Sequence, residues 1–390
     1  MRLDRFLDFF TSLKLTVVCL ILGMALVFIG TLAQVNMGLY QAQAVFFRSF
    51  FVFWGPAEAV WKIPVFPGGY LIGGLLLINL LTGHYRRFGF RRDKAGIIIT
   101  HAGLILLLLG QLATDLFSRE SNLHFRLNET MNYSEADRSW ELAVIDVTDP
   151  KDNRVVAIPD YTLASEKAVR SAALPFSLAV KEFRHNATLS DNAQPGFQKT
   201  AATAGFGPQI WYRVEPRTTK MDGRDTPTAI VELQAAGGQS LGTWFFSGNL
   251  NPQTFTVSNR TFEAGLRLGR YYQPFSLQLL QFDHDVYPGT QIPKNFASRV
   301  RLHNPANAET REVKIRMNEP LRYGGLTFYQ ASFDADNQGS VLQVVRNPGW
   351  ITPYVGCLLV GAGLTLQFLL HLIPFLKRRL AATNSDARPS

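Results

Sequence analysis

Hydrophobic residues gather in four long stretches of this chain, and short alternations of apolar and polar residues fill the region between the third and the fourth. No charged residue occurs between Lys14 and Arg48 or between Lys62 and Arg86. A helix that crosses a bilayer needs about 20 predominantly apolar residues, and each stretch is long enough to form one. The pattern predicts transmembrane helices at about residues 15–34, 68–84, 95–114 and 347–376.

Two of these helices have alternatives or uncertain ends. A cleaved signal peptide is the alternative for the first, because a basic start followed by an apolar run fits both. The run is longer than an ordinary signal core and no small-residue cleavage site follows before Gln34, so we expect it to stay as a membrane helix. Prolines interrupt the fourth stretch, the last of them Pro374, and its helix is expected from about Thr352 to Phe375.

In the region 115–346, apolar and polar residues alternate with the two-residue period of a sheet that has one solvent-exposed face. Its alternation predicts a large β-sandwich-like domain between the third and fourth helices, so the fold class is membrane α plus extracytoplasmic all-β. The stretches from Pro175 to His185 and from Pro274 to His284 share six positions at the same spacing, from a duplicated β unit or by chance. Strands are expected at 140–147, 176–183, 210–216, 228–234, 255–259, 275–282, 299–303 and 312–317.

The net charge of +9 is concentrated in three short segments. Residues 1–14, 85–94 and 377–390 hold twelve Lys and Arg against four Asp and Glu, which leaves the β domain nearly neutral. Basic residues beside membrane helices mark the cytoplasmic side, so the excess predicts no nucleic-acid partner. We expect both termini, the basic loop 85–94 and the basic tail 377–390 to be cytoplasmic, with the β domain on the outer, periplasmic side.

Aromatic residues are dense in residues 35–66, between the first two predicted helices. Such density suggests a segment at the membrane interface, with an ordinary packed loop as the alternative. The two cysteines, Cys19 and Cys357, fall inside predicted helices without a C-x-x-C pair, which argues against thiol-redox chemistry. No phosphate-binding loop, nucleotide fingerprint or nucleophile elbow occurs, so no autonomous active site is predicted.

His101 is the residue that most suggests chemistry, because it lies about 10 Å into the bilayer from Lys94. Ionisable residues in membrane helices usually mark a ligand, proton or ion pathway, and imidazole is a common axial ligand of haem iron. A histidine that merely packs against another helix is the alternative. Gly96, Gly103 and Gly110 form a stripe about 150° from His101, so this stripe is expected to pack within the bundle while His101 faces a different neighbour.

The other histidines have plainer explanations from sequence. His84 and His371 lie near helix ends, where an imidazole can reach the interface. The histidines of the β domain show no ligand spacing and are expected on the surface or in the core: His124, His185, His284 and His303.

The sequence resembles the ResB/CcsB family of System II cytochrome c biogenesis proteins. The residues that carry this resemblance are Ser12–Leu15 with Gly30–Leu32, Phe282 and Tyr287–Thr290 with Ser298, Asn318–Leu321 with Tyr329–Gln330, and Asn347–Gly349. The family implies a bacterial inner (cytoplasmic) membrane subunit that helps transport haem b, as transient cargo, and present it with apocytochrome c for covalent attachment. It also implies His101 as an axial haem ligand, with His84 as the alternative.

The resemblance further implies a CcsA/ResC-type haem-handling partner and thiol-reducing proteins of the same pathway. Thioether formation would occur on the partner, which makes this chain a non-catalytic or co-catalytic subunit. A membrane-anchored β-domain scaffold for another envelope complex, without haem binding, is the alternative. A cytochrome b-like carrier is the third reading, and it would need His84 or His371 at a depth that matches His101.

Overall fold

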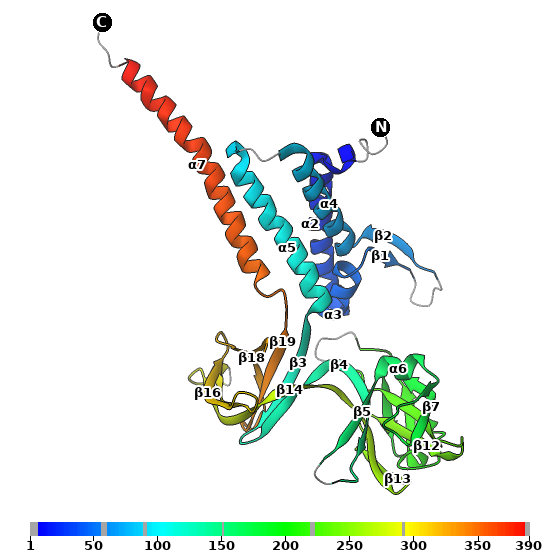
Figure 1. The fold of residues 1–390 in the computed structure, drawn as a ribbon. Helices are drawn as coiled ribbons and strands as arrows, with labels where there is room; N and C mark the ends of the chain where they lie inside the picture. The colour runs from blue at the N-terminus through cyan, green and yellow to red at the C-terminus, as the bar shows by residue number, and fades with distance from the viewer. Residues whose placement is uncertain are drawn as a thin grey trace. The chain divides into compact units, whose positions relative to one another are not determined.

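A computed structural model describes residues 7–55, 61–88, 92–149, 152–218, 223–290 and 293–386. Parts of the predicted basic loop and basic tail, residues 89–91 and 387–390, lie outside the described residues. The chain divides into two compact units. A helical unit contains Met1–Ser118 and Asn347–Ser390, and a β unit contains Arg119–Thr218 and Asp222–Arg346 (Figure 1).

The helical unit consists of long apolar helices and one small hairpin. Among the described residues, three helices are long and apolar enough to cross a membrane, namely α2, α5 and the Thr352–Leu380 part of α7. Membrane helices joined to a large, mostly-β domain are therefore confirmed. The elements of the unit are α2 (Leu13–Met37), α3 (Leu39–Ala42), the π-helix η1 (Gln43–Phe47), β1 (Phe51–Trp54), β2 (Ile63–Pro67), α4 (Gly69–Gly83), the π-helix η2 (His84–Phe88), the 3₁₀-helix η3 (Arg92–Lys94), α5 (Ala95–Phe117) and α7 (Thr352–Asp386).

Helix α4 occupies the second apolar stretch and is short. Its 15 residues rise about 22 Å, less than the roughly 30 Å of a bilayer core. The π-helix η2 continues it without a break from His84 to Phe88. A second full transmembrane helix at 68–84 stays a prediction.

Helix α7 begins at Thr352, as predicted, and runs through Pro374 to Asp386. The predicted helix end near Phe375 is therefore wrong, whereas the cytoplasmic basic tail 377–390 stays a prediction. Proline removes one backbone hydrogen bond and crowds the preceding turn, and this disruption does not end a long helix when both flanks favour helical structure. The residues after Pro374 include Leu, Lys and Arg, which are good helix formers.

Each of the eight segments predicted as strands overlaps a strand of the β unit, although some extend past its ends. The larger of two surprises is β14, a single strand of 27 residues. The elements are β3 (Arg119–Arg126), β4 (Thr130–Asp146), β5 (Arg154–Pro159), α6 (Asp160–Ser165), β6 (Ala168–Val169), β7 (Phe176–Arg184), β8 (Ala187–Ser190), β9 (Gln198–Lys199), the 3₁₀-helix η4 (Gly207–Gln209), β10 (Trp211–Val214), β11 (Thr228–Ala235), β12 (Ser240–Ser247), β13 (Gln253–Val257), β14 (Arg260–Val286), β15 (Pro293–Asn304), β16 (Glu309–Arg316), β17 (Leu321–Tyr323), β18 (Leu326–Phe333) and β19 (Gly339–Arg346).

The described strands of the β unit form three sheets. The largest has ten strands, in the order β16-β15-β14-β4-β3-β19-β18-β17, with β13 paired to β14 and β5 to β4. A four-stranded sheet has the order β12-β11-β7-β6, and a three-stranded sheet has the order β8-β10-β9. Neighbouring strands in these sheets are antiparallel, which leaves one face for the core and one for solvent.

The two largest hydrophobic cores of the β unit define two lobes. In lobe 1, the four-stranded sheet packs against β5, β13 and the adjoining parts of β4 and β14, with Phe262 and Val231 fully buried. In lobe 2, β3 and β15 to β19 surround the other part of β14, with Phe125 and Phe328 fully buried. The second surprise is that β4 and β14 run through both lobes and pair with each other in each.

Candidate functional site

His101 lies beside His84 in the helical unit. Their ring centroids are 6.3 Å apart and the ring planes are tilted by 59°. Both side chains are half-buried between α5 and the end of α4. The structure therefore brings together the two histidines that the sequence treated as a first choice and an alternative.

His84 lies where α4 passes into its π-helical continuation η2. Single π-helical turns are frequent at functional sites. His101 lies in the second turn of α5, on the part of the helix that packs against η2.

The opposite face of α5 packs against α7 through glycines. A Cβ placed on Gly103 would lie 2.8 Å from the carbonyl oxygen of Gly356, and one on Gly96 would lie 2.5 Å from the backbone nitrogen of Gln367. Gly110 is similarly crowded by Thr352. We call this α5–α7 contact the glycine seam. The predicted packing of the glycine stripe is confirmed, and the different neighbour of His101 is His84 of the same chain.

His371, the other membrane histidine, does not join this pair. It is exposed on α7, and its Nδ1 lies 2.8 Å from the carbonyl oxygen of Gln367 one turn earlier. Among the described residues, no group of three or more His, Cys, Asp or Glu side chains could hold a metal ion. The paired imidazoles are thus a two-donor site.

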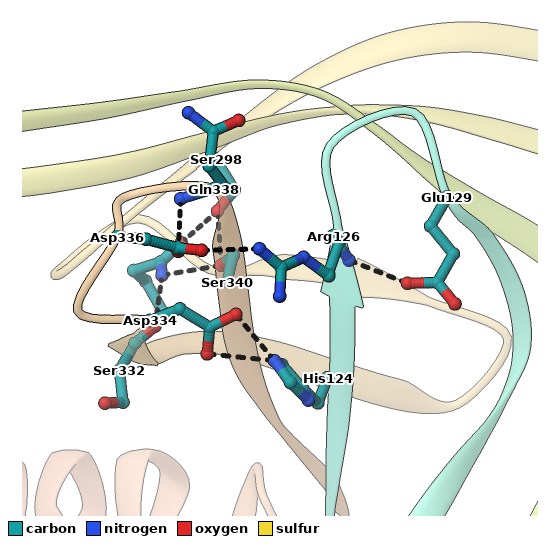
Figure 2. Close-up of polar contacts among 10 residues, drawn as sticks. His124, Arg126, Glu129, Ser298, Ser332, Asp334, Asp336, Gln338 and Ser340 are labelled. Atoms are coloured by element: carbon teal, nitrogen blue, oxygen red, sulfur yellow. Dashed lines mark hydrogen bonds and ion pairs between the residues drawn. The ribbon is translucent and has the colours of Figure 1, made fainter.

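The connection between β18 and β19 gathers a polar cluster in lobe 2. Figure 2 shows Asp334 and Asp336 of this connection facing His124 and Arg126 of β3. Both carboxylate oxygens of Asp334 are 3.0 Å from Nε2 of His124, and Arg126 donates to Asp336 at 2.5 Å. The backbone N–H of Gln338 and the Arg126 guanidinium hold the pKa of Asp336 below its ordinary value.

Sequence reasoning missed the carboxylate partner of His124, because Asp334 is 210 residues away. The predicted surface or core setting of the other β-domain histidines fits their neighbours. Nδ1 of His284 is 2.9 Å from Oδ1 of Asn337, and the His284 ring lies 4.3 Å from the Phe333 ring. His303 meets Thr310, and the His185 ring meets Phe183 edge-on.

A buried polar network lies behind this cluster. The hydroxyl of Ser298 donates to Oε1 of Gln330 at 2.6 Å and lies 2.7 Å from the hydroxyl of Ser340. Nε2 of Gln330 also donates to Ser340 at 3.0 Å. All three side chains are buried, and leaving one such group without a partner costs about 1–3 kcal/mol. The network therefore fixes how β15, β18 and β19 pack.

The buried polar network lies in the segment of the chain that matches a known protein family. Residues 242–341, which run from β12 to β19, match the model of the ResB-like family. The resemblance to the ResB/CcsB family is confirmed. Ser298, Gln330 and Ser340 all lie inside the ResB-like segment, and the first two belong to the motifs that suggested the family.

Curated relatives match over short segments. Protein NrfI of Wolinella succinogenes is 38% identical over 96 residues, which are 25% of this chain and 11% of that protein. The cytochrome c biogenesis protein CcsB of Synechococcus elongatus is 34% identical over 107 residues, 27% of this chain and 23% of that protein. CcsB of Trichormus variabilis is 32% identical over 93 residues, 23% of this chain and 20% of that protein. The matches therefore span less than a quarter of each relative.

Proposed function

We propose that this chain is a cytochrome c biogenesis subunit that binds haem in the membrane at His101 and passes it on for covalent attachment. The His84–His101 pair carries the proposal. The ResB-like segment and the printed names of the CcsB relatives support the pathway. Haem b is then transient cargo.

The donor set suits haem better than a bare ion. A structural zinc site takes four ligands, whereas the porphyrin supplies four nitrogens to its iron and needs only axial ligands from protein. With 6.3 Å between their ring centroids, His84 and His101 lie close enough that both imidazoles could be donors to one bound haem.

In this proposal, each part of the chain has a separate task. His101 would hold the iron of bound haem, and His84 would be either a second donor or the residue from which haem passes to the partner. The glycine seam keeps α5 in place while the haem enters and leaves. The β domain holds apocytochrome c or supports a CcsA/ResC-type partner, on which the thioether bonds form, and thiol-reducing proteins of the pathway keep the apocytochrome cysteines available.

The orientation follows from charge. Lys14, Arg86, Lys94 and Lys377 lie near the helix ends that are distant from the β unit in sequence. Basic residues favour the cytoplasmic side, so we propose a bacterial inner-membrane protein with its β domain in the periplasm. The histidine pair then lies in the cytoplasmic half of the membrane.

The test is the visible absorption spectrum of the detergent-purified complex with its CcsA/ResC-type partner. We expect a Soret band in the wild type and in His371→Ala, which removes an exposed membrane histidine outside the pair. His101→Ala should lose the band at normal protein yield, and added imidazole should restore it. A stable wild-type complex without a Soret band would overturn haem binding and favour a membrane-anchored scaffold.

A further inference from the structure

The hairpin between the first two apolar helices is anchored at its base alone. β1 and β2 pair antiparallel, with Val52 opposite Phe66 and Trp54 opposite Ile63. Val52 is only 6% exposed and belongs to the core formed with α2, η1 and α4. We call residues 50–67 the aromatic hairpin; residues 56–60 within it lie outside the described residues.

Beyond Val52, the hairpin exposes apolar side chains on both faces. Adjacent residues of a strand point to opposite faces, yet Phe53 and Trp54 are both more than half exposed. If the hairpin packed against the rest of this chain, one of these two faces would be buried. The exposed large side chains of the hairpin are Phe50, Phe51, Phe53, Trp54, Trp61, Ile63 and Val65.

A polar cluster marks the membrane depth of the hairpin base. Nε of Arg48 lies 2.6 Å from Oδ1 of Asp115, near the end of α5, and the Tyr70 hydroxyl donates to the same carboxylate. The ring of Phe50 lies 5.8 Å from that of Tyr70. Charged side chains at the ends of membrane helices lie at the interface with water, because burying them in hydrocarbon is costly. The aromatic hairpin therefore starts at the interface, on the side where α5 leads into the β unit.

We propose that the exposed apolar side chains of β1 and β2 lie in the interfacial layer of the surrounding lipid on that side of the membrane. Figure 1 shows β1 and β2 projecting away from α2 and α4. Helix α2 of the same unit also exposes large apolar side chains, with Val27 and Phe28 more than half exposed. Lipid thus covers both surfaces without a second protein.

The aromatic side chains and the backbone of the hairpin favour the membrane interface over the hydrocarbon core. Trp and other amphipathic rings settle at the level of the lipid head groups. The outer backbone N–H and C=O groups of a two-stranded sheet need water or head groups as partners, which hydrocarbon does not provide. Between Ser49 and Pro67 the sequence has only two charged residues, Glu58 and Lys62, so the surface is not built to attract a charged partner.

The experiment measures the depth of a probe on the hairpin. Phe53→Cys is made in the full-length protein with Cys19→Ala and Cys357→Ala, labelled with a nitrobenzoxadiazole dye, and reconstituted into phosphatidylcholine vesicles. Quenching is measured with lipids brominated near the head group or near the chain end, and with iodide in the water. Val27→Cys on α2 is the deep control, and Tyr161→Cys in α6, 70% exposed, is the aqueous control. If the Cys19→Ala background fails to fold, buried Cys19 is retained.

The expected result is quenching of the Phe53 probe by shallow bromines at least about twofold stronger than that of the Tyr161 probe. The Val27 probe should respond most to the deep bromines. A Phe53 probe quenched by iodide alone would place the hairpin in water and overturn the proposal. A probe protected from both quenchers would show that protein covers the hairpin, which overturns it equally. Neither outcome bears on haem binding.

Discussion

The two faces of α5 differ in what they contact, although the same 23-residue helix forms both. One face carries glycines and packs so tightly on α7 that a methyl group would collide with backbone. The other carries His101, half-buried beside His84. Close packing tolerates almost no change in volume, whereas a ligand face needs a donor atom and some space. The helix thus separates structural from chemical requirements, and substitutions on its two faces should have different consequences.

The largest effect should come from filling the glycine seam. A Cβ on Gly363 of α7 would lie 2.5 Å from the backbone nitrogen of Thr100. Gly363→Leu should destabilise the helical unit by more than about 3 kcal/mol and sharply reduce the yield of monodisperse protein in detergent. Size-exclusion chromatography of the purified protein measures this.

Gly361 provides a matched control two residues away, because nothing lies within 4 Å of a Cβ placed there. Gly361→Leu should leave the yield close to that of the wild type. Equal losses from both substitutions would show that leucine is harmful anywhere on α7, and the seam would lose its special role.

His101→Ala should affect haem and leave assembly intact. We expect haem affinity to fall by about 100-fold, or about 2.7 kcal/mol, because the iron loses its principal ligand. Titration of the purified complex with haem measures the affinity, and thermal unfolding monitors the fold. A variant that loses its fold along with its haem would show that the two faces of α5 are not separate.

His84→Ala should have a smaller effect, because His101 can still hold the iron. We expect haem affinity to fall by about tenfold, or about 1.4 kcal/mol, and the spectrum to change toward five-coordinate iron. An unchanged spectrum would mean that the second axial ligand comes from elsewhere, such as the partner. A loss as complete as that of His101→Ala would mean that the two imidazoles act as one unit.

The smallest effect should come from the polar end of the glycine seam. Oε1 of Gln367 accepts from the backbone N–H of Ile97 at 3.2 Å, and its Nε2 donates to the carbonyl oxygen of Asp93 at 3.3 Å. Gln367→Met keeps the side-chain volume but removes both bonds, and should cost about 1 kcal/mol. The midpoint of thermal unfolding reports this, and a cost as large as that of Gly363→Leu would place the strength of the seam in hydrogen bonds instead of close packing.

Sequence periodicity was sufficient for the features that depend on neighbouring residues. The spacing of Gly96, Gly103 and Gly110 predicted the seam, and alternation predicted strands such as β7 and β11. It could not show that His84 meets His101, because this contact depends on how two different helices pack. It also placed the end of the fourth helix near Phe375, because the effect of Pro374 depends on the whole helix around it.

Contacts between distant segments were beyond sequence reasoning. The His124–Asp334 pair joins residues 210 positions apart, and no local pattern links them. The motif residues Ser298 and Gln330 suggested a family without revealing that they bond to each other. Lobe 1 and lobe 2 also share β4 and β14, so the lobes are not separated at one point in the sequence.

The sharing of β4 and β14 makes lobe 1 an insertion within lobe 2. The chain leaves lobe 2 along β4 and returns along β14, and Glu135 and Arg270 face each other across this pair where the lobes meet. Insertions are best tolerated where the two ends of the inserted part lie close together. Residues between these two points can therefore be lengthened while the two ends of the insertion stay together and lobe 2 stays closed.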